Sequence, residues 1–273
     1  MQYIPITYVD VATAAVLVML NAALSFALQL GIDRQILVSA LRTVVQLTLV
    51  GLVLKTLFAL ASPWLTLLAV TVMILAASTE VASRQDQRFK RWWNFSLGAG
   101  AITLATVLVT LFTLTTHIRP SPWYDPRYSI PLVGIVLGNT MNAVSLGLNG
   151  MLTAAMRERA AIEARLALGA DRFAALKPFM RRSLRAGLIP IVNQMSAAGL
   201  ITLPGMMTGQ ILAGMDPTDA VKYQILILFL LAGGAGIGVF AAVYASAWRL
   251  TDERHRLRLD RLRPAETAGR RRG

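Results

Sequence analysis

Long apolar runs alternate with short polar segments along nearly all of this 273-residue chain. Seven of the runs come close to the roughly 20 residues with which a helix crosses the hydrocarbon core of a bilayer. They cover residues 9–30, 36–60, 63–79, 95–116, 130–152, 186–214 and 222–248. The third run is the weakest, because it is short before the polar residues Ser78, Thr79 and Glu80 follow. The pattern predicts an all-α, polytopic integral membrane protein with about seven transmembrane helices.

Composition agrees with this fold class. Charged residues make up 15% of the chain and the mean hydropathy is +0.57, which is too apolar for a soluble domain of this length. No polar segment is long enough for a separate soluble domain, so we expect one transmembrane domain over residues 1–250, with a cytoplasmic loop at 153–185 and a basic tail at 251–273. The chain has no cysteine, which excludes disulfides and thiolate metal sites. The N-terminal segment lacks the basic start and cleavage site of a signal peptide, and we expect it to be retained.

The net charge of +13 is concentrated in three segments. Four Lys and Arg lie in residues 84–91, eight in 157–185 and nine from residue 249 onward. Basic clusters that alternate with apolar runs are typical of cytoplasmic loops, so they indicate membrane orientation rather than a nucleic-acid partner. The positive-inside rule predicts an outer N-terminus and an inner C-terminus.

The segment between the fifth and sixth runs, MRERAAIEARLALGADRFAALKPFMRRSLRAG, predicts two cytoplasmic helices. Its first part is rich in the good helix formers Ala, Leu, Arg and Glu. Gly169 then interrupts the pattern, and Asp171 is placed to cap a second short helix that begins near Arg172. Such a hairpin suits a groove on a partner protein, but it also suits the lipid surface, where its arginines would meet anionic head groups.

The stretch EARLALGADRF, residues 163–173, resembles the coupling segment of ATP-binding-cassette permeases, whose pattern is Glu-Ala-Ala, three residues, then Gly. Glu163, Ala164 and Gly169 match; Arg165 replaces the second Ala, and the later Ile-x-Leu-Pro portion is absent. Three further blocks extend the likeness: LRTVVQLTLVGLVL (41–54), PLVGIVLGNTMNAVSLGLN (131–149) and LPGMMTGQILAGMDPTDAVKYQI (203–225). Together they resemble the FetB-type permease family, which is linked to iron export in bacteria and aluminium tolerance in plants.

The resemblance implies a permease subunit that exports iron or another metal across the inner membrane, as two permeases with two separate ATPase subunits. The chain has no G-x-x-x-x-G-K-[ST] loop, so ATP and Mg are expected on a cytosolic ATPase partner, and no cofactor on this chain. The ATPase would dock on residues 157–182, with six coupling residues: Glu163, Ala164, Gly169, Ala170, Asp171 and Arg172. The alternatives are a stand-alone channel or secondary transporter, or a non-metal cargo such as a sugar nucleotide; we find no convincing internal repeat of the kind secondary transporters carry.

Polar side chains recur within the apolar runs, where each either lines a translocation path or bonds to a neighbouring helix. The candidate path residues are Arg42, Gln46, Glu80, Asn139, Asn142, Ser145, Asn149, Asn193, Gln194 and Ser196. Arg42 needs an anionic partner, such as Glu80, or must extend to the interface. Small residues four apart, Gly134 with Gly138 and Gly234 with Gly238, favour helix packing within one subunit, with a homodimer contact as the alternative.

The sixth run is too long for one straight helix. Residues 184–213 would span about 45 Å as a helix, against a hydrocarbon core of about 30 Å. Pro204 and Gly205 favour a break there, and Asp216 is placed to cap the next helix. The block is either an outer gate or a kink that only serves packing; the gate residues would be Pro204, Gly205, Met206, Met207 and Gln210.

Candidate metal ligands are few. Met206 and Met207 offer thioethers, although methionine more often fills irregular packing. His117 and His255 have no neighbours at metal-ligand or catalytic-triad spacing, so the sequence predicts a transporter without a catalytic site of its own.

Overall fold

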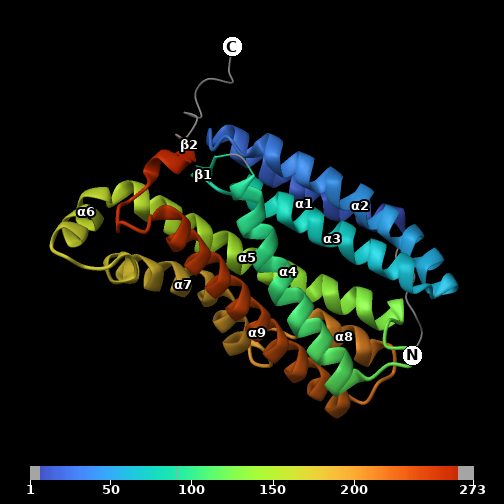
Figure 1. Cartoon of the computed structure of the whole chain (residues 1–273). Coiled ribbons are helices and arrows are strands. Elements are labelled where there is room, and N and C mark those ends of the chain that lie inside the picture. Colours follow the sequence, from blue (N-terminus) through green and yellow to red (C-terminus); the bar gives the residue numbers. More distant parts are fainter. Residues whose placement is uncertain (1–6, 91, 264–273) are drawn as a thin grey trace. The chain divides into compact units, whose positions relative to one another are not determined.

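A computed structural model describes residues 7–90 and 92–263 of the chain. It divides into two compact units, residues 1–61 and residues 62–273. In the first unit, α1 (Tyr8–Ala27) and α2 (Asp33–Leu60) contact each other (Figure 1). A capping box starts α1: the Thr7 hydroxyl accepts from the backbone N–H of Asp10, and the Asp10 carboxylate accepts from the backbone N–H of Thr7.

The second unit contains the remaining elements. They are α3 (Pro63–Ser83), β1 (Arg88–Phe89), α4 (Trp93–Thr113), the π-helical turn η1 (Leu114–Ile118), α5 (Pro126–Arg157), α6 (Arg159–Ala167), α7 (Arg172–Ala197), α8 (Gly205–Leu212), α9 (Pro217–Leu250), the 3₁₀ turn η2 (Leu259–Arg261) and β2 (Leu262–Arg263). The long helices α5 and α9 pack along each other, and α3, α4 and α7 pack around them. Asp216 caps α9 as expected, because its carboxylate accepts from the backbone N–H of Thr218 at 2.8 Å.

Small residues allow the central helices to approach closely. Gly234 and Gly238 of α9 face Thr140 of α5, so that a Cβ on either glycine would lie 3.1 Å from Oγ1 or 2.5 Å from Cγ2 of that threonine. Gly147 of α5 and Gly187 of α7 face Val239 of α9 in the same way. These glycines therefore serve helix packing within one chain.

Six helices in the described part of the chain are long and apolar enough to cross a membrane: α1, α2, α3, α4 with η1, α5 and α9. The predicted sixth run, 186–214, is not one of them. Its first half forms the end of α7 and its second half contains α8. The expectation of a short second cytoplasmic helix was wrong in length, since the helix that begins at Arg172 continues without interruption to Ala197. The exact number of spans and the orientation of the termini stay predictions.

Candidate functional site

The predicted coupling segment forms a helical hairpin from α6 and the start of α7. Gly169 ends the first helix with a φ of +89°, a conformation that favours glycine. Asp171 caps α7, because its carboxylate accepts from the backbone N–H groups of Phe173 at 2.8 Å and Ala174 at 2.9 Å. These hydrogen bonds lower the pKa of Asp171. The sequence-predicted helix, glycine turn and capped helix are therefore confirmed as local structure.

One face of α6 packs against the core of the second unit, and the opposite face is exposed to solvent. Ile162 is fully buried and belongs to the hydrophobic core of the second unit. Glu163 lies on the outer face, where its carboxylate accepts from Nε of Arg159 at 2.8 Å with the side chain 46% exposed. Leu168, at the turn, is 88% exposed. The hairpin tip, which contains Glu163 and Leu168, is therefore exposed and carries both charged and apolar side chains, while Ile162 anchors α6 to the core.

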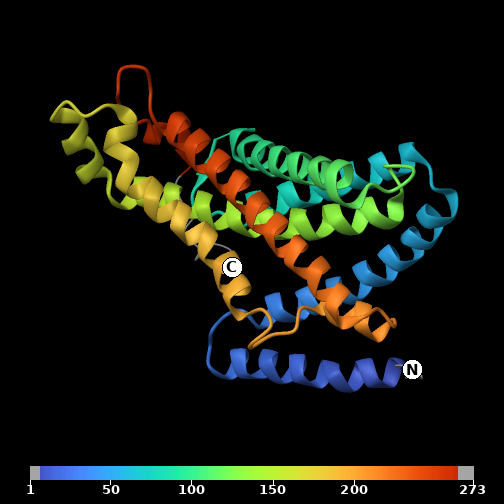
Figure 2. The same ribbon diagram turned by 90° about the horizontal axis from the view of Figure 1, so that it is seen from below.

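Residues 251–263 of the basic tail fold against the second unit. Residues 264–273 lie outside the described part of the chain, but β2 pairs antiparallel with β1, which brings Leu262 opposite Phe89. Both side chains are buried, with 4% and 3% exposed. The His255 Nδ1 atom accepts from the backbone N–H of Arg172 at 3.1 Å. The tail therefore joins the connection between α3 and α4 to the first turn of α7, and Figure 2 shows the tail loop at the same end of the unit as the α6–α7 hairpin.

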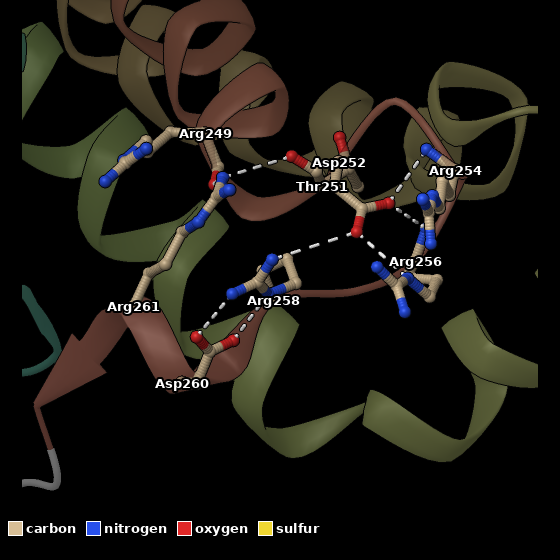
Figure 3. Close-up of polar contacts among 8 residues, drawn as sticks. All are labelled: Arg249, Thr251, Asp252, Arg254, Arg256, Arg258, Asp260 and Arg261. Atoms are coloured by element: carbon tan, nitrogen blue, oxygen red, sulfur yellow. Dashed lines mark hydrogen bonds and ion pairs between the residues drawn. The ribbon is translucent and has the colours of Figure 1, made fainter.

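Ion pairs within the tail hold its shape (Figure 3). Asp252 accepts from the backbone N–H and Nε of Arg256, at 2.9 and 3.0 Å. Arg258 donates to both carboxylate oxygens of Asp260 at 2.8 Å, which lowers the pKa of Asp260 to about 2. Arg261 donates from Nη1 to the carbonyl oxygens at the end of α9, those of Arg249 (2.7 Å) and Thr251 (3.2 Å). Sequence reasoning missed this fold; leucines alternating with arginines over residues 257–262 were the available signal.

The polar face of α5 is paired with the end of α3 and the loop after it. The Asn142 Oδ1 atom accepts from Nη1 of Arg84 at 2.9 Å, and Arg84 also donates from Nε to Glu80 at 3.1 Å. Nε2 of Gln85 donates to the carbonyl oxygen of Ser145 at 3.2 Å. Arg84 and Gln85, which follow α3, thus each bond to one residue of the α5 face, and this supports interhelical bonding as one role of that face.

Asn149 extends the same network at the end of α5 near the coupling segment. Its side chain accepts from the backbone N–H of Asp86 and donates to the Asp86 carboxylate, both at 3.0 Å. A polar cleft of about 480 Å³ opens beside this pair. Its lining is Asp86, Asn149, Gly150, Thr153, Ala154, Arg157, Glu158, Arg182, Ser183 and Ala186. Within the described part of the chain the Thr153 Oγ1 atom beside the cleft is buried and has no hydrogen-bond partner.

Within the described part of the chain, no hydrogen bond connects Asn139 or the polar residues near the end of α7 to these pairs. Nδ2 of Asn139 donates to the carbonyl oxygen of Ile135 in its own helix. Exposed residues near the end of α7 are Asn193, Gln194 and Ser196. Among the described residues no hydrogen bond joins them to the α5 face, so a shared path stays a prediction. Arg42 and Gln46 lie on α2 in the first unit, and the pairing of Arg42 with Glu80 stays a prediction as well.

The predicted break in the sixth run is present and begins before the proline. Helix α7 ends at Ala197, Gly199 has a φ of +85°, and Pro204 is the N-cap of α8. Between them Leu200 and Ile201 are 91% and 83% exposed. Glycine conformation and proline together therefore interrupt the helix over seven residues, 198–204. A gating role stays a prediction.

The gate and metal candidates sit on α8. Gly205 is its first residue, Met206 and Met207 follow, and Met206 packs against the hydrophobic core, which favours packing as its role. The Gln210 Oε1 atom is buried without a hydrogen-bond partner in the described structure. The described residues hold no group of three or more His, Asp or Glu that would bind a metal ion.

Fold and site together define an all-α, multi-pass membrane protein whose exposed helical hairpin adjoins a polar cleft. Comparison with known proteins adds the family. The Uncharacterised protein family (UPF0014) matches residues 8–250, and the chain belongs to this family. No solved structure shows a significant match.

Relatives cover most of the chain. It is 43% identical over 206 residues to the UPF0014 membrane protein slr1647 of Synechocystis sp., which covers 74% of this chain and 77% of the relative. It is 34% identical over 262 residues to the probable iron export permease protein FetB of Escherichia coli, covering 94% and 97%. Protein ALUMINUM SENSITIVE 3 of Arabidopsis thaliana is 29% identical over 234 residues, covering 85% and 83%. The resemblance stated from the sequence blocks is confirmed.

Proposed function

We propose that this chain is the membrane-spanning permease subunit of an ATP-binding-cassette transporter, which exports iron or another metal across the inner membrane. A separate cytosolic ATPase would dock on residues 157–182 and supply the ATP and Mg site, and two permeases would assemble with two ATPases. The name of the Escherichia coli relative, which matches nearly the whole chain, supports the export function.

The observation that carries the proposal is the way the exposed hairpin is connected to the core. Helix α7 begins at the Gly169 turn and continues without a break into contact with α5 and α9. Arg182 of α7 also pairs with Glu158 at the end of α5 at 2.7 Å. A force applied to the tip by a docked ATPase would therefore reach the central helices through one continuous helix, in which Pro178 and Pro190 are positions where it can bend.

The polar cleft beside Asp86 and Asn149 is the proposed inner mouth of the path. Its carboxylate and amide oxygens would contact a hard cation that is bound weakly and released, and the arginines of the same lining, Arg157 and Arg182, would contact the anionic groups of a chelate. At the other end of α7 the interrupted segment 198–204 is the proposed outer gate, since irregular backbone at membrane depth is tolerated only against protein or a cavity.

Co-expression of the chain with a candidate ATPase subunit tests the docking. Glu163→Lys and Gly169→Trp are expected to abolish co-purification, because the first reverses the charge of the exposed tip and the second places a bulky side chain where φ is positive. Asp219→Lys is a matched charge reversal at the start of α9, and it should leave association unchanged. Equal co-purification of all three variants would refute the docking site.

Transport in inverted vesicles tests the reaction. Uptake of iron that requires both ATP and the ATPase subunit supports the proposal. Uptake by the chain alone would instead identify a channel or secondary transporter, and ATP-dependent uptake of a sugar nucleotide but not of metal would correct the cargo.

A further inference from the structure

An open groove of about 980 Å³ lies between helices α7 and α9 of the second unit. The lining consists of α7 residues between Asp171 and Val192 together with Phe240 and Tyr244 of α9. Its first part, up to Arg181, lies within the proposed docking segment 157–182, and the rest lies beyond that segment. The polar network of α5 does not line this groove.

One end of the groove is cationic. Lys177, Arg181 and Arg185 stand four residues apart, so they lie on one face of α7, and all three are exposed. In the described structure none of them forms an ion pair, whereas Arg182, on the adjacent face, pairs with Glu158. Asp171, the acidic residue of the lining, caps the helix and offsets one of the three positive charges. The lining therefore keeps a net positive charge that favours an anionic occupant.

The other end of the groove is apolar. Leu188, Ile189 and Val192 follow the last cation along α7, and Ile189 and Val192 are 43% and 50% exposed. On the α9 wall the ring of Phe240 stacks on that of Tyr244 with centroids 6.5 Å apart, and Tyr244 in turn contacts Phe173 near the cationic end at 6.3 Å. From the first cation to the last apolar residue the groove runs for about 22 Å at 1.5 Å per residue. Along α7 the groove is therefore cationic from Lys177 to Arg185 and apolar from Leu188 to Val192.

We propose that this groove is a binding site for an anionic phospholipid. The phosphate would contact the row Lys177, Arg181 and Arg185, and an acyl chain would lie along Ile189 and Val192 against Phe240. A basic pocket between membrane helices is a common site for such head groups. A soluble phosphate would leave the apolar end uncovered. A second copy of the chain is also a less suitable occupant, because a two-fold axis through the groove would place its three cations against those of the first copy, and like charges repel.

Native mass spectrometry of the purified full chain measures the association with phosphatidylglycerol and phosphatidylcholine. The test variant carries Lys177→Gln, Arg181→Gln and Arg185→Gln. The matched control carries Lys90→Gln, Arg165→Gln and Arg254→Gln, which remove the same charge elsewhere on the basic segments. Since each cation contributes about fivefold to the affinity for an anionic surface, we expect the test variant to lose at least about tenfold for phosphatidylglycerol, and the control to lose little. Phosphatidylcholine should bind weakly to all three proteins.

Two further arms distinguish the other occupants. Glycerol 3-phosphate, which has the charged group without acyl chains, should compete poorly; competition at the same concentration as the lipid would overturn the proposal in favour of a soluble anion. Because the chain has no cysteine, an Ile189→Cys variant reports directly on a neighbouring copy. Efficient disulfide-linked dimers in membranes would show that the groove is an interface between two copies, and equal losses in both triple variants would show that the effect is only general charge. Thermal unfolding of each triple variant verifies its fold.

Discussion

Gly147→Ala and Gly187→Ala are expected to destabilise the protein for different reasons, although both glycines face Val239. A Cβ at Gly147 would overlap Cγ2 of Val239 and meet Cγ2 of Val243 at 3.3 Å, so its closest neighbours are side chains. A Cβ at Gly187 would lie 2.6 Å from Cγ2 of Val239 and 2.7 Å from the carbonyl oxygen of Ala143. That oxygen belongs to the α5 backbone and cannot rotate away.

The expected magnitude follows from two opposing terms. Alanine favours a helix over glycine by about 1 kcal/mol. Overpacking of a well-packed interior costs about 1–3 kcal/mol. A net loss of up to about 2 kcal/mol is therefore expected for each single variant. Val239→Ala removes the overlap at Gly147, so the double variant should be more stable than the sum of its single losses by about 1 kcal/mol or more.

Gly187→Ala is expected to recover less, because the Ala143 oxygen stays in place whatever residue occupies position 239. Denaturant unfolding in mild detergent, followed by tryptophan fluorescence, measures the four free energies of each double-mutant cycle. Equal coupling of Val239 to both glycines would refute this account of the α5–α7–α9 contact. The contact matters for function because α7 carries the hairpin into the core.

Three other predictions concern the tail and the first unit. Leu262→Ala should cost about 2–5 kcal/mol of unfolding free energy for a buried leucine, measured in the same denaturant assay; a loss below that range would mean that the tail does not pack on the core. The Asp260 pKa is lowered from 3.8 to about 2 by Arg258, so the pair stabilises the fold above pH 3.8 and this contribution is lost as the pH falls through about 2; the difference in thermal midpoint between the protein and Asp260→Asn should shrink over that window, and a constant difference would contradict it. Arg42→Ala should lower transport and be partly rescued by Glu80→Ala if the two residues pair; no rescue would indicate that Arg42 extends to the interface instead.

Several features of the fold could be predicted from the sequence because they depend on neighbouring residues. Hydropathy over a window of about 20 residues is enough to recognise the apolar helices. Asp171 and Asp216 bond to backbone N–H groups two or three residues away, so their capping roles can be read from local spacing. The sequence also predicts an interruption at Pro204, but the break begins earlier, at the end of α7, where Gly199 has a positive φ; α7 itself contains Pro178 and Pro190.

Other features depended on which helices pack together. Asn142 and Asn149 bond to Arg84 and Asp86 across 58 and 63 residues of sequence, and their pattern on one helix face was equally compatible with a path. The charge of the tail predicts a solvent-exposed segment. Leu262 is nevertheless buried, because β1 supplies the strand with which β2 pairs. Caps and apolar runs are determined locally, but hydrogen bonds between distant polar groups form only after helix packing has brought those groups within reach. The sequence by itself therefore determined the apolar helices and their N-terminal caps, and only the tertiary structure decided how far α7 extends and which distant polar groups bond to one another.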